Sequence, residues 1–490
     1  MQSALPTLDH AACERARLAR DPRFDGRFFI AVTSTGIYCR TICPVRLPRP
    51  ENVRFFATAA AASEHGFRPC LRCRPELAPD NPYWPQHPPL VCAALNLIDE
   101  GLLDHVGVPD MAARLGVSPR HLRRLFATHL GSSPAMLATT RRTLFAKRLI
   151  SDSNLSMQDI AMAAGFRNVR RFNAAFRQIY GMTPSQIRRR QPTGNKGYSL
   201  RLNYRAPLDW ETLRGFLTKR AIDGVETINE NRYSRQFEWH EQAGMLSLEH
   251  KPDGHHFLLT VSHPRADALY YASQRARHAL DLDAVPSDIH AHLSKDSRLA
   301  PALANHPGLR VPGCWDRFEL CVRAVIGQQV TVAAARTLTQ RVVERCNHRR
   351  ADADGTDCLL FPDARAIANA SLDGLGLTGR RIATLQALAK AVINNDIQLD
   401  SADPQSIDDA LAQLPGFGPW TRAYIGLRGF KNPDAFPAGD IVLRKALANS
   451  PKPLSSREAE ARSQNWRPWR AYAVMALWQS SANATRNPET

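Results

Sequence analysis

Two short cysteine pairs decide how the first part of this chain folds: CRTIC at residues 39–43 and CLRC at residues 70–73. Four thiolates in two closely spaced pairs have the spacing of a tetrahedral zinc site, and such spacing is rare by accident. The sequence therefore predicts one Zn²⁺ ion held by Cys39, Cys43, Cys70 and Cys73. Spacing alone favours a zinc ion that only stabilises a small domain, because most four-cysteine sites are structural.

The residues around these pairs change that interpretation. The segments FFIAVTSTGIYCR (28–40), RPENVRFF (49–56) and GFRPCLRC (66–73) resemble the N-terminal zinc domain of the Ada family, over about Asp21 to Pro79. The resemblance implies that Cys39 is both a zinc ligand and the nucleophile that accepts a methyl group from an alkylated DNA phosphate. Cys43, Cys70 and Cys73 then hold the metal.

The chemistry of such a site agrees with this role. Only a thiolate is nucleophilic, and a metal-bound thiol is deprotonated. Four thiolates on Zn²⁺ carry a formal charge of about −2, which repels ordinary phosphodiesters but not a neutral methyl phosphotriester. Methylation lowers that charge, and one unit charge roughly 10 Å from a phosphate is worth about 0.4 to 1.7 kcal/mol. Summed over several phosphates, this change turns a weak DNA binder into a strong one.

The length of the chain and its net charge indicate how many domains it has and what kind of partner it binds. The chain has 490 residues, enough for about three domains, and a formal net charge of +18. This charge points to a polyanionic partner, although a solvated basic surface is the alternative.

No apolar run reaches the roughly 18 residues of a membrane span, and the start lacks the form of a signal peptide. We therefore expect a cytoplasmic protein with no membrane contact. The other six cysteines are scattered, which argues against a disulfide framework.

The middle of the chain predicts two helix-turn-helix units. A proline-rich linker at 78–89 precedes a helical region that runs to about Arg190. The patterns VPDMAARLGV (108–117) and MQDIAMAAGF (157–166) each lead into a basic helix, at 119–127 and 168–177. Together they resemble the AraC-type DNA-binding domain. Such hairpins also occur in purely structural bundles, but two in tandem with basic second helices favour DNA binding. The expected DNA-contacting arginines are Arg120, Arg123, Arg124, Arg170 and Arg171.

After a polar linker at 191–197, the hydrophobic period changes to that of strands. Strands are predicted at 198–204, 232–239, 244–250 and 256–261, with a helix at 208–221. From Trp315 the chain is expected to be helical again. There the segment LPGFGPW (414–420) reads as a helix-hairpin-helix, whose glycines Gly416 and Gly418 let backbone N–H groups approach a phosphate.

The region from about Lys196 to Ser480 resembles the AlkA family of 3-methyladenine DNA glycosylases II. The resemblance implies that Asp440 is catalytic and that Trp420, Tyr424 and Trp478 line a pocket for a flipped, cationic base. The alternatives are a helix N-cap for Asp440 and core packing for the aromatic residues.

Two further features qualify this resemblance. Relatives with lyase activity have a lysine where this hairpin has Trp420, so a monofunctional enzyme is expected. Gln328 and Gln329 match the family's wedge loop, but Gln329 replaces its leucine, which leaves the lesion range open. A monovalent cation at the hairpin is a further expectation.

The sequence thus predicts a multidomain protein. It combines a small α+β zinc and methyl-acceptor domain (1–79), an all-α double helix-turn-helix domain (88–190), a mixed α/β subdomain (197–312) and an all-α helix-hairpin-helix glycosylase domain (313–480). The expected function is excision of alkylated bases combined with methyl-dependent transcriptional activation. Expected partners are double-stranded DNA and RNA polymerase, with the protein a monomer.

Two rival interpretations stay open at this point. In the first, a transcription factor uses a catalytically weak glycosylase-like region only to bind DNA. In the second, a glycosylase uses its front half only for targeting. The chain lacks the Pro-Cys-His-Arg motif of the methyltransferase that ends most Ada proteins, so repair of O6-methylguanine is not expected.

Overall fold

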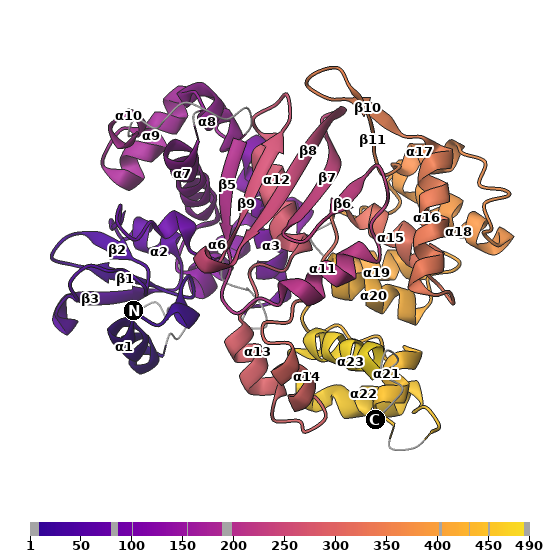
Figure 1. Cartoon of the computed structure of the whole chain (residues 1–490). Coiled ribbons are helices and arrows are strands. Elements are labelled where there is room, and N and C mark those ends of the chain that lie inside the picture. Colours follow the sequence, from indigo (N-terminus) through magenta and orange to yellow (C-terminus); the bar gives the residue numbers. More distant parts are fainter. Residues whose placement is uncertain are drawn as a thin grey trace. The chain divides into compact units, whose positions relative to one another are not determined.

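The computed structural model describes residues 9–79, 87–99, 101–153, 155–188, 198–400, 404–430, 432–448 and 451–484. The chain forms two compact units (Figure 1): residues 1–205 with 248–274, and residues 206–247 with 275–490. The predicted linker at 191–197 and most of the linker at 78–89 lie outside the described residues. Among the helices described, none is both long and apolar enough to cross a lipid bilayer.

In the first unit, a four-stranded sheet in the order β3-β1-β2-β4 carries the cysteine pairs. The strands are β1 (Phe29–Val32), β2 (Ile37–Cys39), β3 (Val53–Phe56) and β4 (Arg68–Pro69). β1 is antiparallel to β2 and β3, whereas β4 is parallel to β2. Because β2 ends at Cys39 and β4 ends just before Cys70, this parallel pair brings the two cysteine pairs to the same end of the sheet.

Helices pack on both faces of this sheet. They are α1 (His10–Ala19) and α2 (Ala59–Glu64), with short 3-10 turns η1 (Pro22–Phe24), η2 (Pro50–Asn52) and η3 (Pro75–Leu77). Side chains alternate along β1, so that Phe29 and Ala31 pack with α2 while Ile30 packs with α1. The sheet is therefore covered on both faces, and the cysteines lie at its end.

The rest of the first unit is mainly helical, as the sequence predicts. It contains α3 (Pro89–Asp99), α4 (Leu102–His105), α5 (Val108–Arg114), α6 (Pro119–Leu130), α7 (Pro134–Asp152), α8 (Met157–Ala163), α9 (Val169–Tyr180) and α10 (Pro184–Ile187). α7 contacts the cysteine-rich part directly, because Lys147 donates to the buried Glu76 carboxylate at 3.1 Å. A buried ion pair of this kind fixes the relative position of the elements that carry it.

A five-stranded sheet in the order β5-β9-β8-β7-β6 follows. Its strands are β5 (Tyr198–Asn203), β6 (Glu226–Ile228), β7 (Arg232–Trp239), β8 (Gln242–Lys251) and β9 (His256–Ser262), with the turn η4 (Pro252–Gly254). β5 pairs with β9 and β6 with β7, both antiparallel, and the boundary between the two units lies within β8. Four strands agree closely with the predicted ranges. The short β6 was not predicted, because three residues are too few to show a period.

Helices dominate the second unit. They are α11 (Trp210–Thr218), the end of α12 (Ala268–Ala279), α13 (Pro286–Leu293), α14 (Ala300–Asn305), α15 (Arg317–Ile326), α16 (Val332–Cys346), α17 (Ala364–Asn369), α18 (Gly379–Ile393), α19 (Pro404–Gln413), α20 (Pro419–Gly429), α21 (Ile441–Ala446), α22 (Ser456–Arg462), η5 (Ser463–Trp466) and α23 (Arg470–Ala484).

The chain is mainly helical beyond Trp315, as predicted, but the helices begin before that residue and one strand hairpin lies among them. α12 to α14 already precede that residue, and a hairpin of β10 (Arg349–Ala351) and β11 (Asp357–Leu359) interrupts the helices beyond it. The hairpin forms because the segment between its strands turns sharply: Asp352 accepts backbone N–H groups, and Gly355 has a φ of +79° that glycine adopts without strain.

Candidate functional site

The four predicted zinc ligands meet in one buried cluster. The Sγ atoms of Cys39, Cys43, Cys70 and Cys73 all lie within 4.8 Å of one another. Backbone hydrogen bonds set this geometry, because the N–H group of Cys70 donates to the Tyr38 carbonyl at 2.9 Å across the parallel pair of strands. The four cysteines that the spacing pairs as ligands are thus brought together by the fold.

This cluster fits a zinc ion. A tetrahedral site with Zn–S bonds of about 2.3 Å separates its sulfur atoms by about 3.8 Å. The observed sulfur cluster is compatible with that size. Four thiolates this close repel one another strongly, so a divalent cation between them removes the main cost of the arrangement. Within the described part of the chain, these residues form the candidate metal site.

A buried arginine supports the cluster from behind. The backbone N–H group of Arg40 donates to Cys73 Sγ at 3.3 Å, and its guanidinium donates to the Cys73 carbonyl at 3.1 Å. The same guanidinium pairs with the Asp25 carboxylate, with Nε to Oδ1 at 2.9 Å. Arg40 and Asp25 are 6% and 4% exposed, so both charges depend on each other.

We expect Asp25→Asn to destabilise the cysteine-rich part. The substitution removes one charge of a buried pair and leaves Arg40 uncompensated, which costs about 3 to 5 kcal/mol. Thermal unfolding with zinc release read by a chromogenic chelator measures this loss. Glu51→Gln is the matched control, because Glu51 and Arg49 form an exposed pair at 3.9 Å. Equal melting of the two variants would contradict a supporting role for Asp25.

The two helix-turn-helix units are built as predicted. α5 and α8 end at turns where Gly116 and Gly165 have φ values of +67° and +76°. The second helices then start at side-chain caps, with Ser118 accepting from His121 N–H on α6 and Asn168 accepting from Arg171 N–H on α9. The left-handed glycine turn between the helices is what gives each pair its geometry.

The predicted DNA-contacting arginines are exposed on these second helices. α6 buries Leu122 and Phe126, and α9 buries Phe172 and Phe176. The opposite faces present Arg120, Arg123, Arg124, Arg170 and Arg171. Each second helix therefore offers a basic outer face whose orientation is fixed by its apolar inner face.

In the second unit, Asp440 lies at an open cleft and is only 9% exposed. It is the N-cap of α21, since Oδ1 accepts the Leu443 N–H group at 3.0 Å. The indole Nε1–H groups of Trp420 and Trp478 donate to the two oxygens of the same carboxylate, at 3.0 and 3.3 Å. Both interpretations of Asp440 can therefore hold together: it caps a helix and also presents a fixed carboxylate to the cleft.

The three predicted pocket aromatics line this cleft together. The rings of Trp420 and Tyr424 are stacked, with centroids 5.5 Å apart and planes 11° apart. The ring centroid of Trp478 lies 6.4 Å from that of Tyr424. All three are partly buried, so they border the core and face the cleft at once. Such an aromatic wall suits a flat ligand, cationic or neutral.

The two glutamines at the wedge position, Gln328 and Gln329, have different surroundings. Gln328 turns inward and donates from Nε2 to the Gly416 carbonyl at 2.8 Å and to Thr421 Oγ1 at 3.0 Å. Gln329 is exposed, with a φ of +54° that is uncommon for a residue with a side chain. Gly416 has a φ of +94°, and a Cβ there would lie 2.4 Å from Thr384 Oγ1. Gly418 is exposed and forms the N-cap of α20.

Sequence reasoning missed the charged groups behind both sites. Arg40 and Asp25 are fifteen positions apart in sequence, and no periodic signal joins them. In the second unit, Arg220 and Arg428 line the cleft beside Tyr424. The position of Arg428 four residues after Tyr424 on a helix was a usable signal, because such residues share a face. Arg220 comes from a distant segment and gave none.

Four family models match successive parts of the chain. They are the metal binding domain of Ada (residues 12–76), a helix-turn-helix domain (111–190), the AlkA N-terminal domain (199–316) and the HhH-GPD superfamily of base excision DNA repair proteins (322–470). The order of these matches is the order of the predicted domains.

Individual relatives agree with these matches. The "3-methyladenine DNA-glycosylase" of Archaeoglobus fulgidus superposes on 58% of this chain and 98% of its own with a TM-score of 0.51 and 17% identity, which shows a shared fold. The "DNA-3-methyladenine glycosylase 2" of Escherichia coli is 31% identical over 56% of this chain and 95% of its own.

One relative spans almost the whole chain. The "Probable bifunctional transcriptional activator/DNA repair enzyme AlkA" of Mycobacterium tuberculosis is 39% identical to it over 478 residues. The match covers 96% of each chain, so this protein belongs to the family of bifunctional transcriptional activator/DNA repair enzymes.

Proposed function

We propose that this protein removes alkylated bases of the 3-methyladenine type from DNA and also accepts methyl groups from DNA methylphosphotriesters on Cys39 to activate transcription. The observation that carries the first activity is the Asp440 carboxylate, held by three N–H groups beside the stacked rings of Trp420 and Tyr424. The observation that carries the second is the four-cysteine cluster in one unit with two exposed basic helices.

Base removal requires the target nucleotide to leave the helix and enter the cleft. A base alkylated at N3 or N7 is cationic and already a good leaving group. As its N-glycosidic bond breaks, positive charge develops on the sugar, and the fixed Asp440 carboxylate stabilises that charge and orients the attacking water. The aromatic faces of Trp420 and Tyr424 hold the cationic base by stacking and cation–π attraction.

The enzyme is proposed to be a monofunctional hydrolase. A lyase needs an amine that attacks the sugar carbon, and the hairpin carries Trp420 where such relatives carry lysine. The expected product is an abasic site in an intact strand. Gel analysis of the treated duplex, before and after heating in alkali, distinguishes this product from a strand cut by the protein itself.

Methyl acceptance uses the first unit. Cys39, Cys43, Cys70 and Cys73 would hold Zn²⁺, which keeps the thiolates deprotonated and nucleophilic when bound. Arg40 holds the cluster together through its contacts to Cys73. Transfer forms a C–S bond to Cys39, breaks the C–O bond of the triester and leaves an ordinary phosphodiester. The lower negative charge of the product cluster then favours DNA.

Several finer parts of this proposal come from the sequence or from the family resemblance. They are RNA polymerase as a partner, a monovalent cation at the 414–418 hairpin, a monomeric state, a cytoplasmic location and the domain limits 1–79, 88–190, 197–312 and 313–480. Light scattering of the full chain with and without duplex DNA tests the monomeric state. Limited proteolysis followed by mass measurement tests the domain limits.

The basic helices supply a separate prediction. Arg123→Ala or Arg171→Ala should weaken binding to promoter DNA, and the slope of log affinity against log salt should flatten by about one unit for each phosphate that the variant no longer neutralises. Base release should be unchanged, because the catalytic cleft lies in the other unit. Arg365→Ala removes the same charge from an exposed position on α17 and should leave promoter binding intact.

Fluorescence anisotropy across a salt series measures both quantities. A folded Arg123→Ala variant that binds promoter DNA like wild type would remove α6 from the DNA interface. The base-release assay on methylated duplex DNA decides between the proposed enzyme and its main rival, a regulator with a catalytically weak glycosylase-like region. No release above the level of DNA alone would favour that rival.

A further inference from the structure

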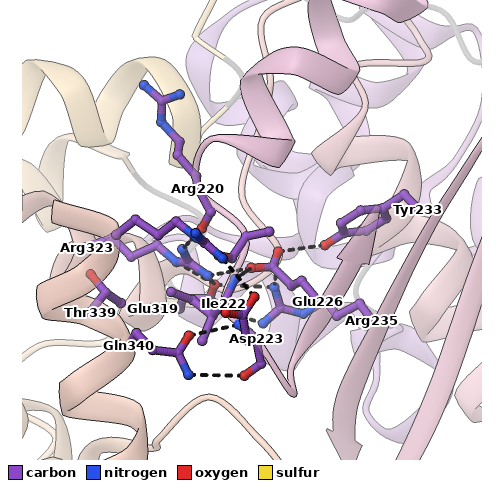
Figure 2. A network of polar contacts seen from close by, with 12 residues as sticks. Arg220, Ile222, Asp223, Glu226, Tyr233, Arg235, Glu319, Arg323, Thr339 and Gln340 are labelled. Carbon is purple, nitrogen blue, oxygen red and sulfur yellow. Dashed lines mark hydrogen bonds and ion pairs between the residues drawn. The ribbon is translucent and has the colours of Figure 1, made fainter. Parts of the chain in front are cut away.

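A buried cluster of four alternating charges lies between the α/β segment and the helices of the second unit (Figure 2). Arg235 and Arg323 each pair with both Glu226 and Glu319; Arg323 does so at 2.8 and 2.7 Å. The Tyr233 hydroxyl also donates to Glu226 at 2.9 Å. The ionic charges balance, so the cluster can stay buried without a net charge.

This cluster and its neighbours fix the backbone of residues 220–223. Arg323 donates to the Arg220 carbonyl at 2.7 Å, and Arg336 donates to the Ala221 carbonyl at 2.6 Å. The N–H groups of Ile222 and Asp223 donate to Glu226 and Gln340. Figure 2 shows that the Arg220 side chain points away from this cluster. The backbone from which this side chain extends is therefore fixed by contacts that involve no ligand.

Arg220 and Tyr424 both line the cleft. The Arg220 guanidinium lies over the Phe216 ring, 3.7 Å from the ring centre, and donates to the Phe216 carbonyl at 3.2 Å. From there its positive charge acts on the Tyr424 hydroxyl. Arg428 donates to the same hydroxyl at 2.8 Å and is itself fixed by the carbonyl groups of Pro312 and Gly313 at 3.0 and 2.8 Å. One anchored guanidinium thus donates to the pocket hydroxyl, and the positive charge of a second acts on it.

The hydrogen-bond partners of the Tyr424 hydroxyl determine whether it can donate to a ligand. Guanidinium groups only donate, so the Tyr424 oxygen accepts from Arg428 and its own hydrogen is left to donate elsewhere. We propose that Arg220 and Arg428 position the Tyr424 hydroxyl as a hydrogen-bond donor to an acceptor atom of the departing purine base. This inference rests on the proposed base-removal activity. Tyr424 touches the base, whereas Arg220 acts through Tyr424 as a positioning and specificity-determining residue.

The chemistry assigns different tasks to the two sides of the pocket. Electron density accumulates on the base as the N-glycosidic bond breaks, and a donor at the base edge stabilises it without giving up its proton. Asp440 instead acts on the sugar, which is the same for every lesion. Loss of Arg220 should therefore change the preference among bases, whereas loss of Asp440 should slow the release of all of them.

The test uses duplex DNA treated with dimethyl sulfate, which carries both 7-methylguanine and 3-methyladenine. These two bases present different acceptor atoms, so one fixed donor cannot serve both equally. Single-turnover release of each base is measured with saturating wild type, Tyr424→Phe, Arg220→Met and Arg220→Lys. Tyr424→Phe and Arg220→Met should each shift the ratio of the two rates by about five-fold or more in the same direction, a usual size for the removal of one hydrogen bond.

Two further variants distinguish the positioning of the Tyr424 hydroxyl from a simple loss of positive charge. One is a lysine at position 220, and the other removes an arginine elsewhere. Arg220→Lys keeps the positive charge but loses the planar group that stacks on Phe216, so its ratio should shift less than that of Arg220→Met. Arg365→Met removes an equal charge from an exposed position on α17, outside the cleft, and any loss of DNA affinity should affect both bases equally. If Arg220→Met does not fold, Tyr424→Phe alone tests the donor, because it removes one hydroxyl and keeps the ring.

The pH profile provides a second readout. Burial raises the pKa of Tyr424, but the positive charges of Arg428 and Arg220 outweigh it, so the pKa lies below its ordinary value. The charged groups facing this hydroxyl are Arg220 after α11 and Arg428 on α20, with Arg323 of α15 behind Arg220; α23 contributes the neutral Trp478. Wild-type rates should therefore fall as the pH rises toward 10 and the donor ionises. Burial lowers the pKa of Arg220 to about 10, so this arginine loses its charge over the upper end of the same range.

That alkaline fall should be absent in Tyr424→Phe and displaced to higher pH in Arg220→Met, which keeps one of the two guanidiniums. An unchanged ratio of the two bases in folded Tyr424→Phe and Arg220→Met would overturn the inference, as would shifts in opposite directions. If wild type releases neither base, the proposed activity itself fails. The two failures are thus distinguishable.

Discussion

Asp440→Asn should lower the single-turnover rate of 3-methyladenine release by about 100-fold or more. The substitution removes the negative charge that stabilises the sugar in the transition state, and loss of one preorganised electrostatic group usually costs that much. The helix cap should survive, because asparagine also caps helices and can keep the bond from Leu443 N–H. The amide nitrogen of the asparagine would then face the Trp420 N–H group and could not accept its hydrogen bond. The Trp420 side chain should therefore be held less firmly as well.

Binding and chemistry can be separated in this variant. Damaged DNA should still bind to Asp440→Asn, while the rate at saturating enzyme falls. Asp363→Asn is the matched control, since Asp363 caps α17 through the Ala366 N–H group at 2.7 Å in the same unit. That control should release the base at the wild-type rate. Near wild-type excision by Asp440→Asn would show that another group stabilises the transition state.

Cys39→Ser should abolish methyl acceptance from DNA bearing methyl phosphotriesters. Serine is not ionised at neutral pH, so the nucleophile is lost even if three cysteines still hold the metal. Tryptic peptides report the site clearly, because Phe28–Arg40 contains Cys39 alone and Thr41–Arg46 contains Cys43 alone. In wild type, the mass of one methyl group should appear only on the first of these peptides.

The matched control for this prediction is Cys92→Ser, which removes a partly buried thiol outside the cluster and should leave methyl acceptance intact. Methylated wild type should also bind promoter DNA more tightly than unmethylated protein, because one unit of negative charge has been removed from the site. A methyl group found on Cys43, Cys70 or Cys73 instead would show that the resemblance gave the wrong nucleophile.

Local patterns predicted those parts of the molecule whose chemistry is contained within a few consecutive residues. The cysteine pairs, the glycine turns at Gly116 and Gly165 and the capping position of Asp440 all have short signals of this kind. Four strands of the larger sheet followed from alternation over six or more residues. The strands β6, β10 and β11, at three residues each, were missed because so short a segment shows no period.

The rest depended on contacts between distant segments. Arg40 meets Asp25 from fifteen residues away, and Arg220 lines the same cleft as Tyr424 although it comes from another part of the unit. Buried charges are rarely foreseeable from sequence, because their partners are defined only once the chain has folded. Gln328 shows the same limit: it matched a wedge motif, yet its side chain holds the hairpin at Gly416 and Thr421.

The central claim is that one chain both excises alkylated bases and accepts methyl groups from the DNA backbone. A single incubation of the zinc-loaded full chain with dimethyl sulfate-treated duplex DNA tests it, followed by mass spectrometry of both the released bases and the tryptic peptides. The account predicts free 3-methyladenine together with methylated Phe28–Arg40. Absence of either signal from folded protein, or a methyl group on a different cysteine, would contradict it.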